Sequence, residues 1–297
     1  MTDPVQIALV GAGHMGRLHA RTIAARADAR LVAVCDVDAT AAAALAETYG
    51  ARALGEVEGL AGAVDAVVLA AATSAHRDLA LPLIRAGVPL LVEKPLAGTA
   101  AEAREIARAA ERAEAVLQVG HILRFDPVTR AMAGRTFRPT QVSVSWRSPF
   151  TGRSTDISVV MDLAIHSIDL ALKWAGRMPQ EVTAKGRTVK GPHTDEVEAH
   201  LEFADGCAAD LVASRVSETR ERRIRITAAG ETIELDYAAR TVRWGSEALP
   251  VEAGPDALTA QMNAFLAAVR GEAPVAVSAD EGARAVEVAE QIERAAV

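Results

Sequence analysis

The fold is decided by the stretch Val5-Gln6-Ile7-Ala8-Leu9-Val10-Gly11-Ala12-Gly13-His14-Met15-Gly16. Its first half is a short apolar run, typical of a buried strand, and its second half is a GxGxxG pattern that opens a predicted helix. Gly11 permits a tight turn, Gly13 lets the backbone approach a pyrophosphate, and Gly16 allows the helix to pack closely on the strand. The helix N-terminus then attracts phosphate oxygens. The cofactor-binding residues expected here are Gly11, Gly13, His14, Met15 and Gly16.

The type of dinucleotide is indicated by Asp36, which lies 20 residues beyond Gly16 at the end of the second predicted strand. A carboxylate at this place accepts a hydrogen bond from the adenosine ribose 2′-hydroxyl. The next residues are Val37 and Asp38, so no arginine follows that could pair with a 2′-phosphate. The sequence therefore favours NAD over NADP.

The first 120 residues alternate short apolar runs with Ala-rich helical stretches, which is the pattern of a parallel sheet covered on both faces. Strands are expected at Val5–Val10, Leu31–Cys35, Ala66–Ala71, Pro89–Val92 and Val116–Val119. Helices are expected at about 14–27, 38–49, 75–86 and 99–114, with Asp38 and Thr99 as N-caps and Gly50 and Gly87 as C-terminal stops. This pattern predicts a dinucleotide-binding Rossmann domain at residues 1–120.

After Gly120 the pattern changes to apolar-polar alternation, which is typical of antiparallel strands with one solvated face. Strands are expected at Gln141–Arg147, Val197–Phe203, Ala208–Val212, Arg223–Ala228, Thr232–Asp236 and Thr241–Trp244, and helices at about 157–175, 256–270 and 279–295. We therefore expect an α/β fold with a second domain at residues 121–297, built on an open, mostly antiparallel sheet. This domain would bind substrate and form a homo-oligomer, with the active site between the two domains.

The composition excludes several classes of partner. The formal net charge is −7 and no cluster of basic residues stands out, so neither nucleic acid nor an anionic membrane is an expected partner. The N-terminus does not resemble a secretory signal and no long uncharged apolar run is present, which predicts a cytoplasmic protein. Cys35 and Cys207 match no metal or redox spacing and are expected to be buried thiols.

Lysine is rare in this chain, since only four of the 32 basic residues are lysines: Lys94, Lys173, Lys185 and Lys190. A chain that uses arginine for nearly all its positive charge has reason to keep a lysine where a compact, titratable ammonium is needed. Lys94 is therefore a candidate functional residue. The alternative is that Arg-rich codon usage left this lysine by chance.

Four further segments resemble the glucose-fructose oxidoreductase / inositol dehydrogenase (Gfo/Idh/MocA) family. They are Thr73-Ser74-Ala75-His76, Glu93-Lys94-Pro95, the stretch Gly120-His121-Ile122-Leu123-Arg124-Phe125-Asp126-Pro127, and Asp162-Leu163-Ala164-Ile165-His166-Ser167-Ile168-Asp169. The resemblance covers essentially the whole chain. It implies an NAD-dependent oxidoreductase in which a cis peptide bond precedes Pro95, Lys94 contacts the substrate hydroxyl, and Thr73 and Glu93 line the cofactor.

Asp162, His166 and Asp169 fall at i, i+4 and i+7, so a regular helix would present them on one face. A histidine suits the general base for a secondary alcohol because its ordinary pKa of about 6.5 is near working pH. By the resemblance, Asp162 is the acid of the pocket, and we give Asp169 a supporting role. Two alternatives remain: a structural histidine in the core, and a metal site. We expect no metal, because the sequence offers no third strong ligand.

Within the family, the motifs resemble the branch of UDP-N-acetylglucosamine 3-dehydrogenases, which oxidise a sugar C3 hydroxyl to a ketone. Two features depart from many members: Ser158-Val159-Val160-Met161 replaces glycines before Asp162, and Ile122 replaces an asparagine. The substrate-binding residues expected are Lys94, His121, Arg124, Arg147, Arg153 and Asp169, with Arg147 and Arg153 assigned to a diphosphate.

The sequence thus predicts that His166, helped by Asp162 and Lys94, takes the proton from a secondary hydroxyl while a hydride leaves to NAD. The same chemistry on a free sugar, inositol or glycoside is the nearest alternative. An alternative of another class is a non-catalytic regulator that senses NAD on the same scaffold.

Overall fold

The computed structural model describes residues 3–152 and 157–296, and the chain forms two compact units. Unit 1 comprises Met1–His121 and Leu258–Ala283, and unit 2 comprises Ile122–Ala257 and Arg284–Val297. The sequence placed one boundary at residue 120 and assigned everything after it to the second domain. The structure differs because the segment Leu258–Ala283 belongs to the first unit.

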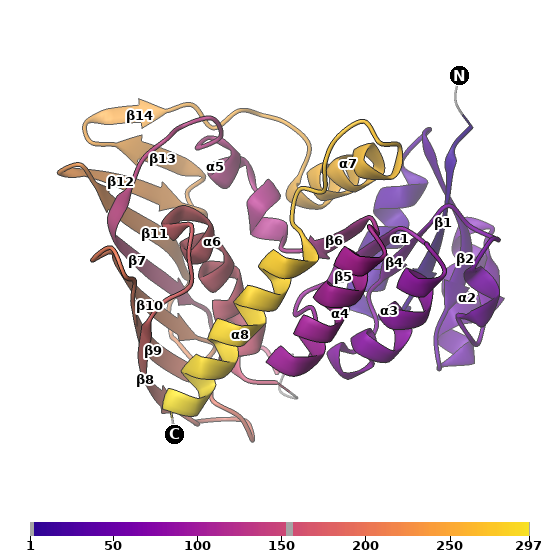
Figure 1. Cartoon of the computed structure of the whole chain (residues 1–297), viewed down its shortest axis with the longest axis horizontal. Helices are drawn as coiled ribbons and strands as arrows, with labels where there is room; N and C mark the ends of the chain where they lie inside the picture. The colour runs from indigo at the N-terminus through magenta and orange to yellow at the C-terminus, as the bar shows by residue number, and fades with distance from the viewer. Residues whose placement is uncertain (1–2, 153–156, 297) are drawn as a thin grey trace. The chain divides into compact units, whose positions relative to one another are not determined.

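Unit 1 is built on sheet A, a parallel sheet of six strands among the described residues (Figure 1). The strands are β1 (Val5–Val10), β2 (Ala29–Cys35), β3 (Arg52–Leu54), β4 (Ala66–Leu69), β5 (Leu90–Glu93) and β6 (Leu117–Gly120). Their order, β3-β2-β1-β4-β5-β6, is that of a dinucleotide-binding Rossmann sheet. The strand order reverses between β1 and β4, where open parallel sheets bind ligands at their carboxyl edge. The predicted fold class is confirmed.

The helices of unit 1 are α1 (His14–Ala24), α2 (Ala39–Tyr49), α3 (His76–Arg85), α4 (Ala100–Arg112) and α7 (Ala257–Val269), together with the short turns η1 (Glu58–Leu60) and η2 (Thr73–Ala75). The predicted N-caps are confirmed, since Asp38 accepts from Thr40 N and Thr99 forms a reciprocal capping box with Glu102. Their side chains satisfy N–H groups that a helix leaves open at its start.

The apolar core of unit 1 explains why the segment Leu258–Ala283 belongs to this unit. Met262, Phe265 and Leu266 of α7 are fully buried in one cluster with Ile7 and Leu9 of β1. Residues from α1 and α2 belong to the same cluster, so these three helices cover one face of sheet A. The periodicity of 256–270 predicted the helix correctly but carried no information about which core would receive its apolar face.

Unit 2 is built on sheet B, which has eight strands in the part of the chain described (Figure 1). They are β7 (Pro139–Arg147), β8 (Glu181–Arg187), β9 (Glu196–Glu202), β10 (Ala208–Ser214), β11 (Glu221–Ala228), β12 (Glu231–Asp236), β13 (Thr241–Trp244) and β14 (Glu247–Leu249), in the order β14-β13-β12-β11-β7-β10-β9-β8. All neighbours are antiparallel except β7 and β10, which are parallel. This confirms the predicted open, mostly antiparallel sheet.

The two faces of sheet B differ in chemistry. Val142, Val144 and Trp146 of β7 are buried on the face against which α6 (Ile165–Ala175) packs. On the other face, charged residues pair across neighbouring strands, as in Arg223–Asp236 at 2.7 Å and Arg225–Glu234 at 2.8 Å. The alternation along each strand therefore separates an apolar face from a polar one.

The remaining elements of unit 2 are η3 (Ile122–Phe125), α5 (Pro127–Arg130) and η4 (Val160–Ala164), and the helix α8 (Ala279–Ala295) begins in unit 1 residues and ends in unit 2 residues. Cys35 and Cys207 are buried as predicted, and burial raises the pKa of the Cys35 thiol to about 11. Across residues 3–152 and 157–296, no helix has the length and apolar character needed to cross a membrane.

Candidate active site

The glycine loop between β1 and α1 has the shape that a pyrophosphate requires. Gly11 has a φ of +104°, and a Cβ there would lie 2.4 Å from the Ala70 carbonyl oxygen. A Cβ at Gly16 would lie 1.9 Å from the Gly11 oxygen, whereas a Cβ at Gly13 would meet nothing within 4 Å. Gly13 also stands at the N-cap of α1, where it has no side chain to cap the helix. Two glycines thus permit close packing and the third leaves open space beside a helix N-terminus, so the loop fits a dinucleotide.

Asp36 connects this loop to the end of β2. Its Oδ2 accepts from the backbone N–H of Ala12 at 2.6 Å, and its Oδ1 accepts from the backbone N–H of Asp38 at 2.9 Å. Each carboxylate oxygen has a second lone pair, so the group can still accept from a ribose hydroxyl. The carboxylate therefore shapes the glycine loop as well as being a candidate cofactor ligand.

Lys94 follows β5 at the carboxyl edge of sheet A, and the Lys94–Pro95 bond is cis, as the resemblance implied. The lysine is half-buried, between the buried residues Glu93 and Pro95. His76, at the start of α3, has Nδ1 3.0 Å from the Pro95 carbonyl oxygen and Nε2 3.1 Å from that of Ala71. Burial lowers the pKa of His76 in spite of these carbonyls, so the neutral ring donates to one of them. This contact links the turn after Lys94 to the segment that carries Thr73.

The Asp162–His166 segment is helical as predicted, but its first turn is wider than an α-helical turn. Asp162 lies in η4, a π-helical turn, and His166 lies in the first turn of α6. Both residues are half-buried. Ser158 begins the segment: its Oγ accepts from the Met161 N–H and donates to Glu293 of α8. Single π turns inside helices occur frequently at functional sites.

Asp169 differs from the other two residues of the predicted face. It is 1% exposed, and its two oxygens accept from Arg124 Nε at 2.6 Å and Arg124 Nη2 at 2.7 Å. This is a buried two-pronged ion pair between α6 and η3. Asp162 and His166 are half-buried, whereas Asp169 is buried against Arg124. The sequence assigned Arg124 and Asp169 separately and did not pair them.

A second buried ion pair, which the sequence did not reveal, supports the chain just before Asp162. Asp195 is fully buried and accepts from Arg215 Nε at 2.7 Å and from the backbone N–H groups of residues 189–191. Burial alone would raise the pKa of Asp195, but these donors hold it far below its usual range. Arg215 also donates to the Ile157 carbonyl at 2.8 Å. The pair therefore fixes the start of the segment that carries the predicted acid and base.

The other predicted substrate ligands have mixed outcomes. His121 is fully buried directly after β6. Arg147 ends β7 on the face opposite to Trp146, with Nε 3.3 Å from Ser145 Oγ and 3.9 Å from a carboxylate oxygen of Glu221. Arg153 lies outside the described residues.

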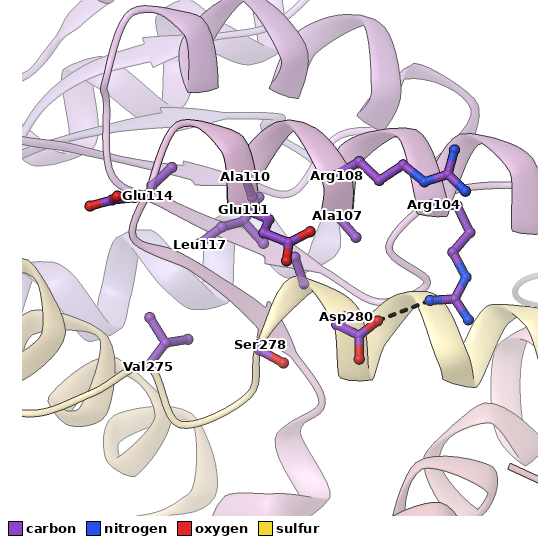
Figure 2. A pocket seen from close by; sticks show the side chains of 12 residues that line it. Arg104, Ala107, Arg108, Ala110, Glu111, Glu114, Leu117, Val275, Ser278 and Asp280 are labelled. Atoms are coloured by element: carbon purple, nitrogen blue, oxygen red, sulfur yellow. Dashed lines mark hydrogen bonds and ion pairs between the residues drawn. The ribbon is translucent and has the colours of Figure 1, made fainter. Parts of the chain in front are cut away.

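A cavity of about 510 Å³ lies on unit 1, and none of the residues described above lines it (Figure 2). Its lining comes from α4, from Glu114, Ala115 and Leu117, and from residues 275–280, and Arg104 Nη1 donates to Asp280 Oδ1 at 2.9 Å. Charges of both signs, including Arg108, Glu111 and Glu114, face the space. None of the predicted site residues lines this cavity, so we do not assign the reaction to it.

Comparisons with known proteins agree with the glycine loop and the two-sheet architecture. Residues 5–121 match the oxidoreductase family with an NAD-binding Rossmann fold, and residues 129–234 match the GFO/IDH/MocA C-terminal domain. A UDP-N-acetylglucosamine 3-dehydrogenase of Acidithiobacillus ferrooxidans is 33% identical over 96% of this chain and 95% of its own. Its solved structure superposes with a TM-score of 0.92 over 99% of this chain and 98% of that chain.

An inositol dehydrogenase and a further solved structure are also similar. An inositol 2-dehydrogenase of Rhizobium meliloti is 34% identical over 71% of this chain and 69% of its own. The structure of GenD2 from gentamicin A biosynthesis, solved in complex with NAD, has a TM-score of 0.84 at 23% identity over 100% of this chain and 95% of that chain, which shows the same fold.

Proposed function

Because the chain belongs to the Gfo/Idh/MocA family of NAD-binding oxidoreductases, we propose that it oxidises the C3 hydroxyl of UDP-N-acetylglucosamine to a ketone. The observation that carries this proposal is the end-to-end similarity to a UDP-N-acetylglucosamine 3-dehydrogenase, in sequence and in both units of the fold. The inositol dehydrogenase is as identical in sequence but over a smaller part of the chain.

In the proposed reaction, His166 takes the proton of the sugar hydroxyl, and Lys94 contacts the hydroxyl oxygen. Asp162 is the carboxylate that we assign to His166, since Arg124 already occupies both oxygens of Asp169. NAD, when bound, supplies the acceptor for the hydride that leaves the carbinol carbon. Gly11, Gly13 and Gly16 shape the loop that holds its pyrophosphate, Asp36 orients its ribose, and Thr73 and Glu93 line its site.

The buried ion pairs support this assignment because they fix the reacting groups in advance. Arg124–Asp169 holds α6, which carries His166, and Asp195–Arg215 holds the segment before Asp162. A general base works efficiently only if it lies within hydrogen-bond reach of its proton, so rigid support contributes directly to rate.

The proposed substrate is tested with a panel of UDP-N-acetylglucosamine, free N-acetylglucosamine, myo-inositol and a methyl glycoside, each followed by NADH formation. We expect the highest kcat/KM with the UDP-sugar. A higher kcat/KM with myo-inositol or the free sugar would favour the alternative substrate class. No NADH with any of them, together with normal NAD binding, would favour the non-catalytic regulator.

The diphosphate of this substrate gives a second test, through Arg147 and Arg153. If these arginines hold it, replacing either with alanine raises KM for the UDP-sugar by about tenfold or more, as loss of a charge-assisted contact does. Arg147 already lies near Glu221, so Glu221→Ala is the matched control, and it would leave KM unchanged or lower it. Unchanged KM in both arginine variants would remove these residues from the proposal.

We further propose that the protein works as a homo-oligomer through the polar face of sheet B. The charged residues of this face, which pair across neighbouring strands, offer groups of both signs to a second copy. Light scattering after size exclusion would give a multiple of the chain mass, and a monomer at all concentrations would contradict this part of the proposal.

A further inference from the structure

A histidine from the first helix and the glutamate before Lys94 form a buried pair in unit 1. His19 lies in α1 with no exposed surface, and Glu93 ends β5 with 6% of its surface exposed. His19 Nε2 lies 2.7 Å from Glu93 Oε1. Since α1 begins at the glycine loop, this pair connects the helix of the dinucleotide loop to the strand end that carries Lys94.

The carboxylate of Glu93 occupies space that a glycine leaves on the neighbouring strand. Glu93 pairs with Gly120 in the register of β5 and β6. A Cβ at position 120 would lie 3.0 Å from the carboxylate carbon and 3.0 Å from Oε2 of Glu93. Any larger residue there would press on the carboxylate, so the packing itself directs Glu93 toward His19.

The protonation of the pair follows from its contacts. Burial alone would raise the pKa of Glu93, but the contact with His19 and the positive charge and backbone N–H of Lys94 bring this pKa below its usual range. An ionised carboxylate only accepts, so His19 Nε2 carries the proton. His19 Nδ1 is buried and has no hydrogen-bond partner within the described part of the chain.

Glu93 also contacts the backbone of Lys94, since its Oε2 accepts from the Lys94 N–H at 3.3 Å. The hydrogen bond from His19 therefore restrains a carboxylate that in turn restrains Lys94. On the other side of the lysine, His76 contacts the Pro95 carbonyl. We propose that His19 is a positioning residue: through Glu93 it holds the backbone of Lys94 in place and ties that placement to the cofactor-binding helix. The inference rests on the proposed function, in which Lys94 contacts the substrate hydroxyl.

The test compares two substitutions that differ in where they place a donor. In His19→Gln the amide nitrogen lies near the former Nε2 and can still donate to Glu93, whereas in His19→Asn it lies near the former Nδ1 and cannot reach. Arg21→Gln, on the exposed side of the same helix, is the matched control. We expect His19→Asn to lower kcat by about 10- to 100-fold, as a misplaced catalytic group does, with KM and the Kd for NAD within about threefold. His19→Gln should restore kcat to within about threefold of wild type.

Two results of this comparison would overturn the inference. One is a kcat of His19→Asn that matches the wild type. The other is a kcat of His19→Gln as low as that of His19→Asn, because the amide donor would then have no effect.

A second measurement, the acetylation rate of Lys94, needs no substrate and is simple to interpret because the chain has only four lysines. Acetylation of the four lysines, followed by mass spectrometry, gives the labelling rate of Lys94 relative to the exposed Lys185 and Lys190 in the same sample. A Lys94 released from its place should react about threefold faster or more in His19→Asn and at the wild-type rate in His19→Gln. An unchanged ratio in His19→Asn would refute the inference. A wild-type enzyme without activity on UDP-N-acetylglucosamine would refute only the proposed substrate, because the labelling ratio does not depend on it.

If His19→Asn does not fold, nitrogen NMR of the histidine rings decides the question on the wild-type protein. The expected signal for His19, identified by its loss in His19→Gln, shows a proton on Nε2. A proton on Nδ1 alone would mean that His19 cannot donate to Glu93, and the inference would fail.

Discussion

Alanine at Gly13 and at Gly16 should separate cofactor binding from folding. A Cβ at Gly16 lies 1.9 Å from the Gly11 backbone oxygen, a contact that only movement of the backbone relieves. Overpacking costs typically about 1–3 kcal/mol, and this contact belongs at the upper end, so we expect Gly16→Ala to lose about 3 kcal/mol. At about 2–4 °C per kcal/mol, Tm should fall by about 6–12 °C.

Gly13→Ala should behave in the opposite way. Gly13 has a φ of −69°, which alanine adopts easily, and its Cβ would meet no protein atom within 4 Å. A small loss at the N-cap is opposed by the lower entropy of the unfolded chain, so stability should change by less than about 1 kcal/mol. The new methyl group would stand where the backbone approaches the pyrophosphate, and the Kd for NAD should rise by about tenfold or more, which corresponds to about 1.4 kcal/mol.

Calorimetric unfolding without ligand and titration with NAD measure the two effects on the same samples. The reasoning is refuted if Gly13→Ala binds NAD as tightly as the wild type, or if Gly16→Ala unfolds at the wild-type temperature. A loss of stability in Gly13→Ala equal to that in Gly16→Ala would also contradict it, because the two positions would then not differ in packing.

Three other predictions concern single side chains. Asp36→Ala should reduce a strong preference for NAD over NADP, measured as two dissociation constants; equal affinities in the wild type would contradict the role of Asp36. His166→Ala should lower kcat by about 10²–10⁴ with little change in NAD affinity, and a variant that keeps more than about a third of the wild-type kcat would place the base elsewhere. Lys94→Arg should not restore the activity lost in Lys94→Ala, because a guanidinium is planar and stays charged. Asp195→Asn should lower stability at pH 7 by about 3–5 kcal/mol, since it leaves the charge of Arg215 buried without the carboxylate that balances it. The pKa of Asp195 is lowered in the folded state, so its contribution is fully present above the unfolded pKa of about 3.9 and is lost as the pH falls below it. The difference in Tm between wild type and Asp195→Asn should therefore shrink in acid, and a difference that stays constant down to pH 2 would refute this.

The sequence predicted those parts of the fold whose signal is local. The run Val5–Val10 coincides with β1, and Thr241–Trp244 coincides with β13, because in both cases the composition of a few neighbouring residues is typical of a strand. The caps Asp38 and Thr99 are also local, since each bonds to N–H groups two or three residues ahead. By contrast, β8 was missed because it carries a lysine, an arginine and a glycine and has no buried residue. Charged edge strands of this kind lack the apolar-polar alternation from which a strand is predicted.

The sequence identified candidate functional residues but not their partners. Spacing along a helix grouped Asp169 with His166, but it gave no sign that Asp169 pairs with Arg124, 45 residues away. His19 and Glu93 are separated by 74 residues, and no spacing rule relates them. Pairs of this kind form only when strands and helices pack together. A sequence motif can therefore identify Lys94 as a candidate residue without indicating which residues position it.

The position of α7 also has a consequence for how the protein is made. Sheet A is fully synthesised once β6 has emerged, but Met262, Phe265 and Leu266, which belong to its core, follow only after the whole of Ile122–Ala257. At about 5–20 residues per second, the nascent Rossmann sheet would wait on the order of ten seconds with one apolar face incomplete. During that interval the second sheet is being translated, and the exposed face is a binding site for chaperones or a source of aggregation. A fragment that stops at residue 121 would lack the α7 side chains of this core, so we expect it to be less stable than a fragment that also carries Leu258–Ala283.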